Sequence, residues 1–178
     1  MSDPAAILLT ESELRAVTHY AVACARPTIE TFERERPGDC RPRLALQEAQ
    51  AFADGARRTK ALRDAAWAAQ RAAQEASAAG CPAASEAARA ALAAAGAAFL
   101  HPLAKATQTK HIVGAAAHAA RALELVTPQD PAALANYLDR VRSLATVQVV
   151  DVLRRYPGAP PGGGRVGALR RWLDAALR

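Results

Sequence analysis

Apolar residues recur at helical spacing along most of the chain, and the clearest stripe lies in residues 59–79. Three or four residues separate its members, which are Leu62, Ala66, Ala69, Ala73 and Ala76. Alanine is a strong helix former because it has no side-chain entropy to lose. A face made mostly of methyl groups also lets another helix axis approach closely. We therefore predict that this segment is the central helix of a bundle.

The same spacing predicts helices along nearly the whole chain. The other segments are 10–36, with a kink or a break at Pro27, and then 39–55, 83–100, 107–126, 130–156 and 165–177. No segment of useful length alternates apolar and polar residues as a strand does. The sequence therefore predicts an all-α fold, a single-domain bundle of six or seven helices with an alanine-rich central helix.

Capping residues mark several of the predicted helix starts. Thr10 and Glu13 have the spacing of a capping box, in which each side chain accepts a hydrogen bond from the other residue's backbone N–H. Asp130 followed by Pro131 is typical of an N-cap and a first helical residue. Asp39 is the predicted cap of the second helix.

A stretch rich in proline and glycine, residues 157–164, precedes the last predicted helix. We expect it to form an extended connector between a bundle made of residues 1–156 and a C-terminal helix, 165–178, that docks on the same domain. Its glycines are not followed by the Lys-Ser or Lys-Thr pair of a phosphate-binding loop. The pattern therefore predicts no nucleotide site in the connector.

Composition narrows the compartment and the class of partner. The chain has 178 residues, of which 51% are hydrophobic but only 4% aromatic, so one core must be built largely from small side chains. No apolar run reaches the roughly 20 residues that span a bilayer, and the first ten residues do not resemble an export signal. Cys24, Cys40 and Cys81 form no CxxC pair, which favours a reducing cytoplasm and cysteines that act as small buried groups. The net charge of +6 favours an acidic partner.

Two groups of residues are candidates for a functional site. The first is a set of polar and aromatic residues, which are Asp39, Arg41, Arg43, Trp67, His101, Lys110, His111 and His118. Within it, His111 and His118 are seven residues apart and therefore share a helix face. The second is a basic surface at the start of the predicted central helix, made of Arg57, Arg58, Lys60 and Arg63.

Each group also has an ordinary structural explanation. Trp67 is compatible with an exposed helix face that carries one packed aromatic side chain. Asp39, Arg41 and Arg43 could hold an anion or tie a turn to a neighbouring helix by ion pairs, and we favour the tie. No HExxH motif, carboxylate pair or CxxC accompanies the histidines, so we predict neither a metal nor a cofactor. Aromatic residues do not interleave with the basic ones, which argues against nucleic acid as the partner.

Several motifs follow one another in an order that is similar to a known family. They are Asp39-x-Arg41-Pro42-Arg43, Ala65-Ala66-Trp67-Ala68-Ala69, Leu100-His101-Pro102-Leu103-Ala104, Lys110-His111-Ile112-Val113-Gly114, Ala119-Ala120-Arg121-Ala122-Leu123-Glu124-Leu125 and Leu173-Asp174-Ala175-Ala176-Leu177. Together they resemble a family of bacterial putative immunity proteins, over nearly the whole chain after Thr10. The resemblance implies a small cytoplasmic helical protein that binds and neutralises a partner toxin and has no catalytic activity.

The leading hypothesis is therefore a non-catalytic, immunity-type protein whose basic surface pairs with an acidic toxin protein. The alternative is a helical small-molecule-binding protein, or an enzyme, with a pocket lined by His and Arg between its helices. In the first case the polar residues point outward and form a partner surface. In the second they surround a cavity. The pattern makes no prediction of the oligomeric state.

Overall fold

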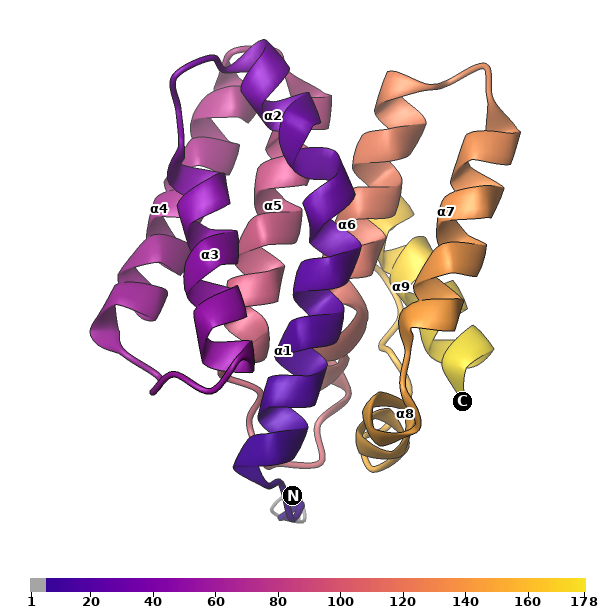
Figure 1. The fold of residues 1–178 in the computed structure, drawn as a ribbon. Helices are drawn as coiled ribbons and strands as arrows, with labels where there is room; N and C mark the ends of the chain where they lie inside the picture. The colour runs from indigo at the N-terminus through magenta and orange to yellow at the C-terminus, as the bar shows by residue number, and fades with distance from the viewer. Residues whose placement is uncertain (1–5) are drawn as a thin grey trace.

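Helices form nearly all of the regular structure in a computed structural model, which describes residues 6–178 (Figure 1). In chain order the elements are α1 (Glu11–Ala25), η1 (Arg26–Thr28, a 3-10 helix), α2 (Ile29–Glu35), α3 (Arg41–Ala53), α4 (Lys60–Ala78), α5 (Pro82–Ala97), η2 (Ala106–Thr109, a 3-10 helix), α6 (Lys110–Val126), α7 (Pro131–Leu144), α8 (Val147–Arg154) and α9 (Gly164–Leu177). The one β-type pairing within residues 6–178 is an isolated bridge between Ala6 and Leu103. The all-α prediction is confirmed. Residues 1–5, where the predicted bundle begins and where no export signal is expected, lie outside the described part.

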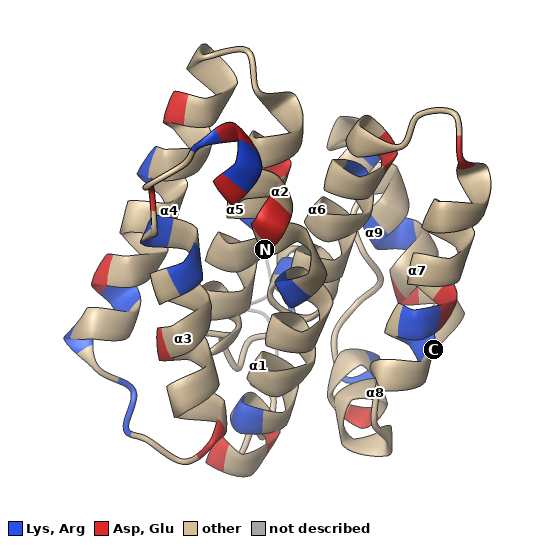
Figure 2. Ribbon diagram, turned by 45° about the horizontal axis from the view of Figure 1, so that its top comes forward, with Lys and Arg blue, Asp and Glu red and all other residues tan. Residues whose placement is uncertain are grey.

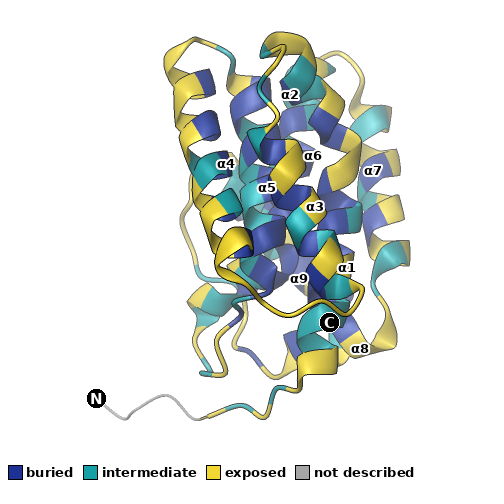
Figure 3. Ribbon diagram, turned by 60° about the vertical axis from the view of Figure 1, so that its left-hand side comes forward, coloured by how far each residue is buried: buried dark blue, intermediate teal, exposed yellow. Residues whose placement is uncertain are grey.

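The alanine-rich segment forms α4 with the buried face that its spacing predicts. The Thr59 hydroxyl accepts a hydrogen bond from the backbone N–H of Leu62 and caps the first turn. The buried positions of α4 are Leu62, Ala66, Ala69, Ala72, Ala73 and Ala76. Figure 3 shows these positions facing the other helices, while the opposite side of α4 is exposed. One side of this helix is therefore available for contacts with other molecules.

The helix at the centre of the fold is α5 rather than α4, which corrects the sequence-based prediction. α5 packs against α4 and α6 on its two sides and lies behind α1 and α3 in the view of Figure 1. α4, α5, α6 and α9 form one layer in that order, and α3, α1 and α7 form the other. The physical reason is that α5 is apolar on most sides, whereas α4 has a polar side that needs water.

Small side chains make the packing around α5 close. Ten of its sixteen residues are buried, and all ten are alanines except Ser85. The Ser85 hydroxyl donates a hydrogen bond of 2.8 Å to the carbonyl oxygen of Ala73, so its polar group is satisfied within the α4–α5 contact. Larger buried side chains come from the surrounding helices and from Tyr156, which follows α8. The helical ones include Tyr20, Phe32, Phe52, Ile112, Val141 and Leu153. The core therefore combines an alanine-rich centre with a periphery of larger side chains.

Two of the predicted helices are divided. At Pro27 the chain forms η1 between α1 and α2, as the proline suggested. The predicted helix over 130–156 is also divided, into α7 and α8, and there the prediction of one continuous helix is wrong. Ala145 has extended backbone angles, and the Thr146 hydroxyl accepts a hydrogen bond from the backbone N–H of Val149, which starts a new helix.

The capping predictions are confirmed at two helix starts and corrected at a third. Thr10 and Glu13 form the reciprocal capping box of α1. Asp130 caps α7, with Pro131 as its first helical residue. Asp39, however, precedes the N-cap position of α3, where the cap residue makes no side-chain bond. The Asp39 carboxylate instead accepts from the Arg41 backbone N–H at 3.1 Å.

The C-terminal helix α9 lies beside α6 and also contacts α7. Leu169, Leu173 and Leu177 are buried in this contact. Asp174, only 5% exposed, accepts a hydrogen bond of 2.9 Å from the backbone N–H of Ala159 and forms an ion pair of 2.8 Å with Arg178. Arg178 in turn donates to the carbonyl oxygen of Pro157 at 3.4 Å, so Asp174 and Arg178 both attach the preceding connector to the C-terminal segment.

All three cysteines are free, but they differ in exposure. Cys24 is buried, Cys81 is partly buried and Cys40 is exposed, so the expectation that all are buried is wrong for Cys40.

Within residues 6–178, no helix is both long enough and apolar enough to cross a bilayer.

Candidate functional site

A pocket of about 370 Å³ opens between α4, α5, α6 and α9, and we call it the α4–α9 pocket. α5 contributes the apolar residues Leu92, Ala93 and Gly96. Trp67 and Gln70 come from the polar side of α4, where a spacing of three residues places them on one face. The lining thus brings together segments that are far apart in the sequence.

Four of the predicted site residues line this pocket: Lys110, His111 and His118 from α6, and Trp67 from α4. Burial lowers the pKa of His111 to about 4, and the nearby charge of Lys110 acts in the same direction. The His111 ring is therefore neutral at pH 7. It lies so close to α5 that a Cβ atom on Gly96 would be 3.5 Å from its Nδ1 atom. This is an ordinary contact distance, so the ring packs directly against α5 at Gly96.

His118 is held by a carboxylate from α5. Its Nδ1 atom lies 2.6 Å from Oε2 of Glu86, and the Nε atom of Arg89 lies 4.0 Å from the other oxygen of the same group. Glu86 is therefore shared by two basic side chains that line the pocket. Among the described residues that line the pocket itself there is no aspartate or glutamate.

Arg170 of α9 brings a guanidinium group to the pocket that has no partner in the described part of the chain. Its Nε atom is buried and makes no hydrogen bond within residues 6–178. Burial lowers the pKa of Arg170, and the charge of Arg171 acts in the same direction. An arginine nevertheless stays charged at pH 7, because its ordinary pKa is very high. The α4–α9 pocket can therefore attract an anion.

Lys110 adds a second positive charge at the pocket. It forms no ion pair with any described residue, and it is exposed. No cluster of three or more His, Cys, Asp or Glu side chains that could hold a metal occurs in residues 6–178. The pocket thus offers positively charged side chains that can bind an anion, next to an apolar and aromatic surface.

Three other predicted site residues, Asp39, Arg41 and Arg43, do not line the α4–α9 pocket. Arg41 bonds Asp39 at 2.6 Å and Glu75 of α4 at 3.0 Å, which ties the start of α3 to α4. The Arg41 guanidinium lowers the pKa of Asp39 by this hydrogen bond. Arg43 bonds Glu33 of α2 at 2.6 Å. The ion-pair interpretation is confirmed for all three, and the hypothesis that they share a pocket with His111 is wrong.

His101 also lies outside the lining of the pocket. It is exposed in the connection between α5 and α6. Its backbone N–H donates to Gln108 at 3.0 Å, and its carbonyl oxygen accepts from the Tyr156 hydroxyl at 2.9 Å. The described contacts of His101 thus involve its backbone, and they fix the path of the connection.

The predicted basic surface, which we call the basic edge, consists of Arg57, Arg58, Lys60 and Arg63 where α3 connects to α4 (Figure 2). The guanidinium groups of Arg58 and Arg63 lie over the Phe99 ring, 5.5 and 5.3 Å from its centroid. Arg58 also donates to the carbonyl oxygen of Ala98 at 2.9 Å, at the end of α5. Lys60 pairs with Asp64 at 2.6 Å. Phe99 therefore orients two of the four cations.

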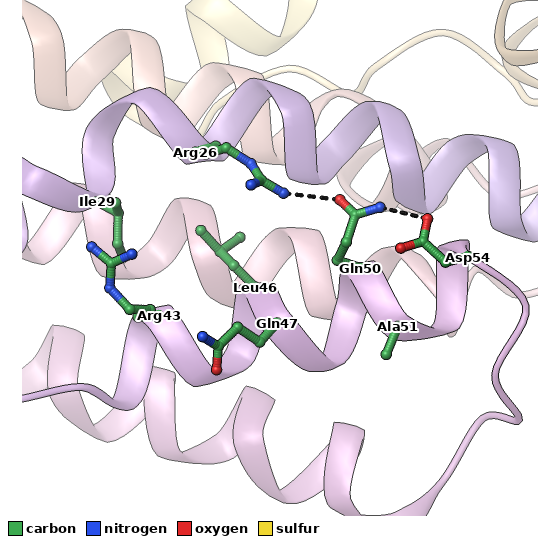
Figure 4. A pocket seen from close by; sticks show the side chains of 8 residues that line it. All are labelled: Arg26, Ile29, Arg43, Leu46, Gln47, Gln50, Ala51 and Asp54. Atoms are coloured by element: carbon green, nitrogen blue, oxygen red, sulfur yellow. Dashed lines mark hydrogen bonds between the residues drawn. The ribbon is translucent and has the colours of Figure 1, made fainter.

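A second hollow, of about 380 Å³, lies between α3 and the α1–α2 junction (Figure 4). Three of its polar side chains form a chain of hydrogen bonds. Arg26 donates to Gln50 at 3.0 Å, and the Gln50 amide donates to Asp54 at 2.8 Å. A ligand that binds Arg26, Gln50 or Asp54 would therefore have to compete with these internal bonds. The α4–α9 pocket, with its unpartnered guanidinium, is the stronger candidate.

Gln70, Arg89 and Arg170 line the pocket although the sequence did not single them out as site residues. A signal existed for Gln70, because it follows Trp67 at helical spacing on the polar side of α4. Arg89 likewise interrupts the apolar pattern of α5. Arg170 had no such signal, because its position depends on where α9 docks.

Comparison with known proteins gives a family but no individual relative. No curated protein and no protein of solved structure matches the chain significantly. The sequence does match a family described as Imm-5 like putative immunity protein, over residues 8–146. This match includes all four residues of the basic edge and the α4, α5 and α6 parts of the pocket, and it ends before α9. Because it covers more than half of the chain, the protein belongs to the Imm-5 like putative immunity protein family.

Proposed function

We propose that this protein is a cytoplasmic immunity protein that binds a toxin protein and neutralises it by direct contact, without a catalytic step of its own. Membership of the family supports this function. The observation that carries the proposal is the basic edge, where Arg57, Arg58 and Arg63 form no ion pair within the described residues. An acidic surface of the toxin is the complement that this edge would select.

The three arginines of the basic edge would lose little free energy on binding an acidic partner. Arg58 and Arg63 are already held over the Phe99 ring, so less side-chain freedom is lost when a partner binds. None of the three arginines has to release a carboxylate of residues 6–178 first, whereas Lys60 is paired with Asp64. The net charge of +6 adds long-range attraction toward an acidic protein and speeds association. Guanidinium groups can also bind carboxylates in a bidentate manner, which favours a specific orientation.

The test compares two charge reversals that change the net charge equally. One variant carries Arg57→Glu and Arg63→Glu in the basic edge. The control carries Arg34→Glu and Arg140→Glu, at exposed positions of α2 and α7 that form no ion pair in the described part of the chain. Glutamate near the start of α4 is favourable for the helix dipole, so Arg63→Glu should fold.

The readouts are growth protection and binding. Bacteria that express a candidate toxin encoded beside this protein should grow when the unmodified protein is present. The basic-edge variant should lose protection and bind the toxin at least about tenfold more weakly, while the control should behave like the unmodified protein. Equal protection by both variants would remove the basic edge as the contact surface. Failure of the unmodified protein to bind or protect against any candidate toxin would refute the proposed function.

A further inference from the structure

We propose that the α4–α9 pocket is a binding site for a small organic anion, a carboxylate carried on a flat aromatic ring. In this arrangement the carboxylate pairs with Arg170, and the ring lies between Trp67 and the apolar surface of α5. The site is separate from the basic edge, and the inference does not depend on the proposed toxin binding.

Arg170 carries a positive charge at the pocket without an ion-pair partner among the described residues. Its guanidinium is partly buried, and its Nε atom is shielded from solvent with no acceptor among residues 6–178. A positive charge that is partly shielded from water and has no ion-pair partner costs free energy. A carboxylate is the natural complement, since its two oxygens match the guanidinium in a bidentate pair. Protein atoms shield the Nε atom from a ligand in the pocket, so the carboxylate would pair with the two Nη atoms of Arg170.

Positive charges outnumber negative charges around the pocket. Lys110, Arg89 and Arg170 are cations that line it. Two acidic groups act on these lining residues: Glu86 contacts His118 and Arg89, and the charge of Asp174 acts on Arg170. Glu86 is already within 2.6 Å of His118. His111 adds no charge at pH 7, because burial lowers its pKa to about 4. The surplus is therefore positive, and it selects for an anion rather than for a neutral or cationic molecule.

The pocket has the size of a small-molecule site and a partly apolar lining. A volume of about 370 Å³ lies within the range of roughly 300–1,000 Å³ that is usual for small-molecule sites. Leu92, Ala93 and Gly96 carry no polar side-chain atoms, so part of any ligand that fills the pocket must be apolar. Trp67 is 58% exposed although it borders the pocket, so much of its indole is free for contact. Aromatic pairs in offset or edge-to-face contact favour a planar ligand at this position.

The test is isothermal titration calorimetry with naphthalene-2-carboxylate as the probe. The neutral isostere naphthalene-2-carboxamide tests the need for charge, and inorganic phosphate tests the need for the ring. We expect saturable binding of the carboxylate, and binding at least about tenfold weaker for the amide and for phosphate. Arg170→Gln should also weaken carboxylate binding about tenfold or more. Arg140→Gln, which removes an exposed arginine of α7 outside the pocket, is the matched control and should change nothing.

A second variant guards against a folding artefact at Arg170. Trp67→Ala removes a largely exposed side chain, so the fold should be retained, as circular dichroism can verify. It should weaken carboxylate binding severalfold, because it removes the aromatic contact. The inference is overturned if the carboxylate does not bind saturably, if the amide or phosphate binds as tightly, or if folded Arg170→Gln and Trp67→Ala bind like the parent. None of these outcomes depends on whether a toxin is bound at the basic edge.

Discussion

Replacing Gly167 with alanine should destabilise the attachment of α9 to the rest of the fold. Gly167 is buried in the first turns of α9, where a Cβ atom would lie 1.9 Å from the carbonyl oxygen of Gly162 and 2.9 Å from its carbonyl carbon. Both are backbone atoms, so no side-chain rotation can relieve the overlap. The connector before α9 would have to move away from the helix.

The size of the effect follows from the bonds that this movement breaks. Arg171 donates to the carbonyl oxygen of Gly162 at 2.7 Å, and the backbone N–H of Gly167 donates to that of Gly163 at 2.8 Å. At about 1 kcal/mol for each hydrogen bond, together with some loss of packing, the free energy of unfolding should fall by about 2–3 kcal/mol. Urea denaturation followed by circular dichroism measures this change.

The matched control is Gly158→Ala in the same connector. A Cβ atom at Gly158 would lie 3.5 Å from the Asp174 carboxylate, which is an ordinary contact distance. This variant should be neutral or slightly stabilising, by about 0.5 kcal/mol, because alanine restricts the unfolded chain. The reasoning is refuted if the two variants unfold at the same urea concentration. Gly167→Ala should also weaken naphthalene-2-carboxylate binding, since α9 carries Arg170.

Three further predictions concern the core, the buried histidine and the first helix cap. The free energy of unfolding should fall by about 2 kcal/mol as the pH decreases from 8 to 5. In the unfolded chain His111 binds a proton at the ordinary histidine pKa of 6.5, whereas in the folded protein it does so only near 4. The urea midpoint of His111→Gln should therefore depend less on pH. Ala69→Leu should lower stability by about 1–3 kcal/mol in thermal denaturation, because Ala69 is fully buried on α4, while Ala61→Leu on its exposed side should change little. Glu13→Gln should lower the free energy of unfolding by about 1–2 kcal/mol at pH 7, because the carboxylate bonds Arg155 at 2.5 Å and has a pKa of about 2. This contribution is present above pH 4.5 and is lost as the pH falls toward 2. The stabilities of parent and variant should therefore converge in an acid titration.

Most helices of this fold are predictable because their buried faces follow from local spacing. The stripe from Leu62 to Ala76 contains enough information to place α4, and Thr10 with Glu13 marks the start of α1. The division between α7 and α8 is harder to predict, because apolar spacing continues across it. Thr146 is the local signal, since its side chain can cap a new helix. Both a continuous helix and a capped restart are compatible with that pattern, and tertiary packing decides between them.

The candidate site is predictable in part, because Trp67 of α4 and three residues of α6 belong to one predicted group and line the same pocket. His111 and His118 lie on one face of α6 by spacing alone, and both line the pocket. Arg170 reaches the same pocket from α9, whose position depends on how its buried leucines pack against α6. The ion pair between Arg41 and Glu75 depends in the same way on the packing of α3 against α4. Local patterns carry no information about such long-range placements.

Because the packing around α5 consists largely of alanine, the residues that determine the fold are different from those that determine recognition. A methyl group has no rotamers, so the contact of α5 with α4 does not depend on how longer side chains are arranged elsewhere. Residues on the polar side of α4, including Arg63 and Trp67, can therefore be exchanged without repacking the interior. A protein built in this way could change the molecules that it recognises by substitutions on one helix side, while its backbone stays in place.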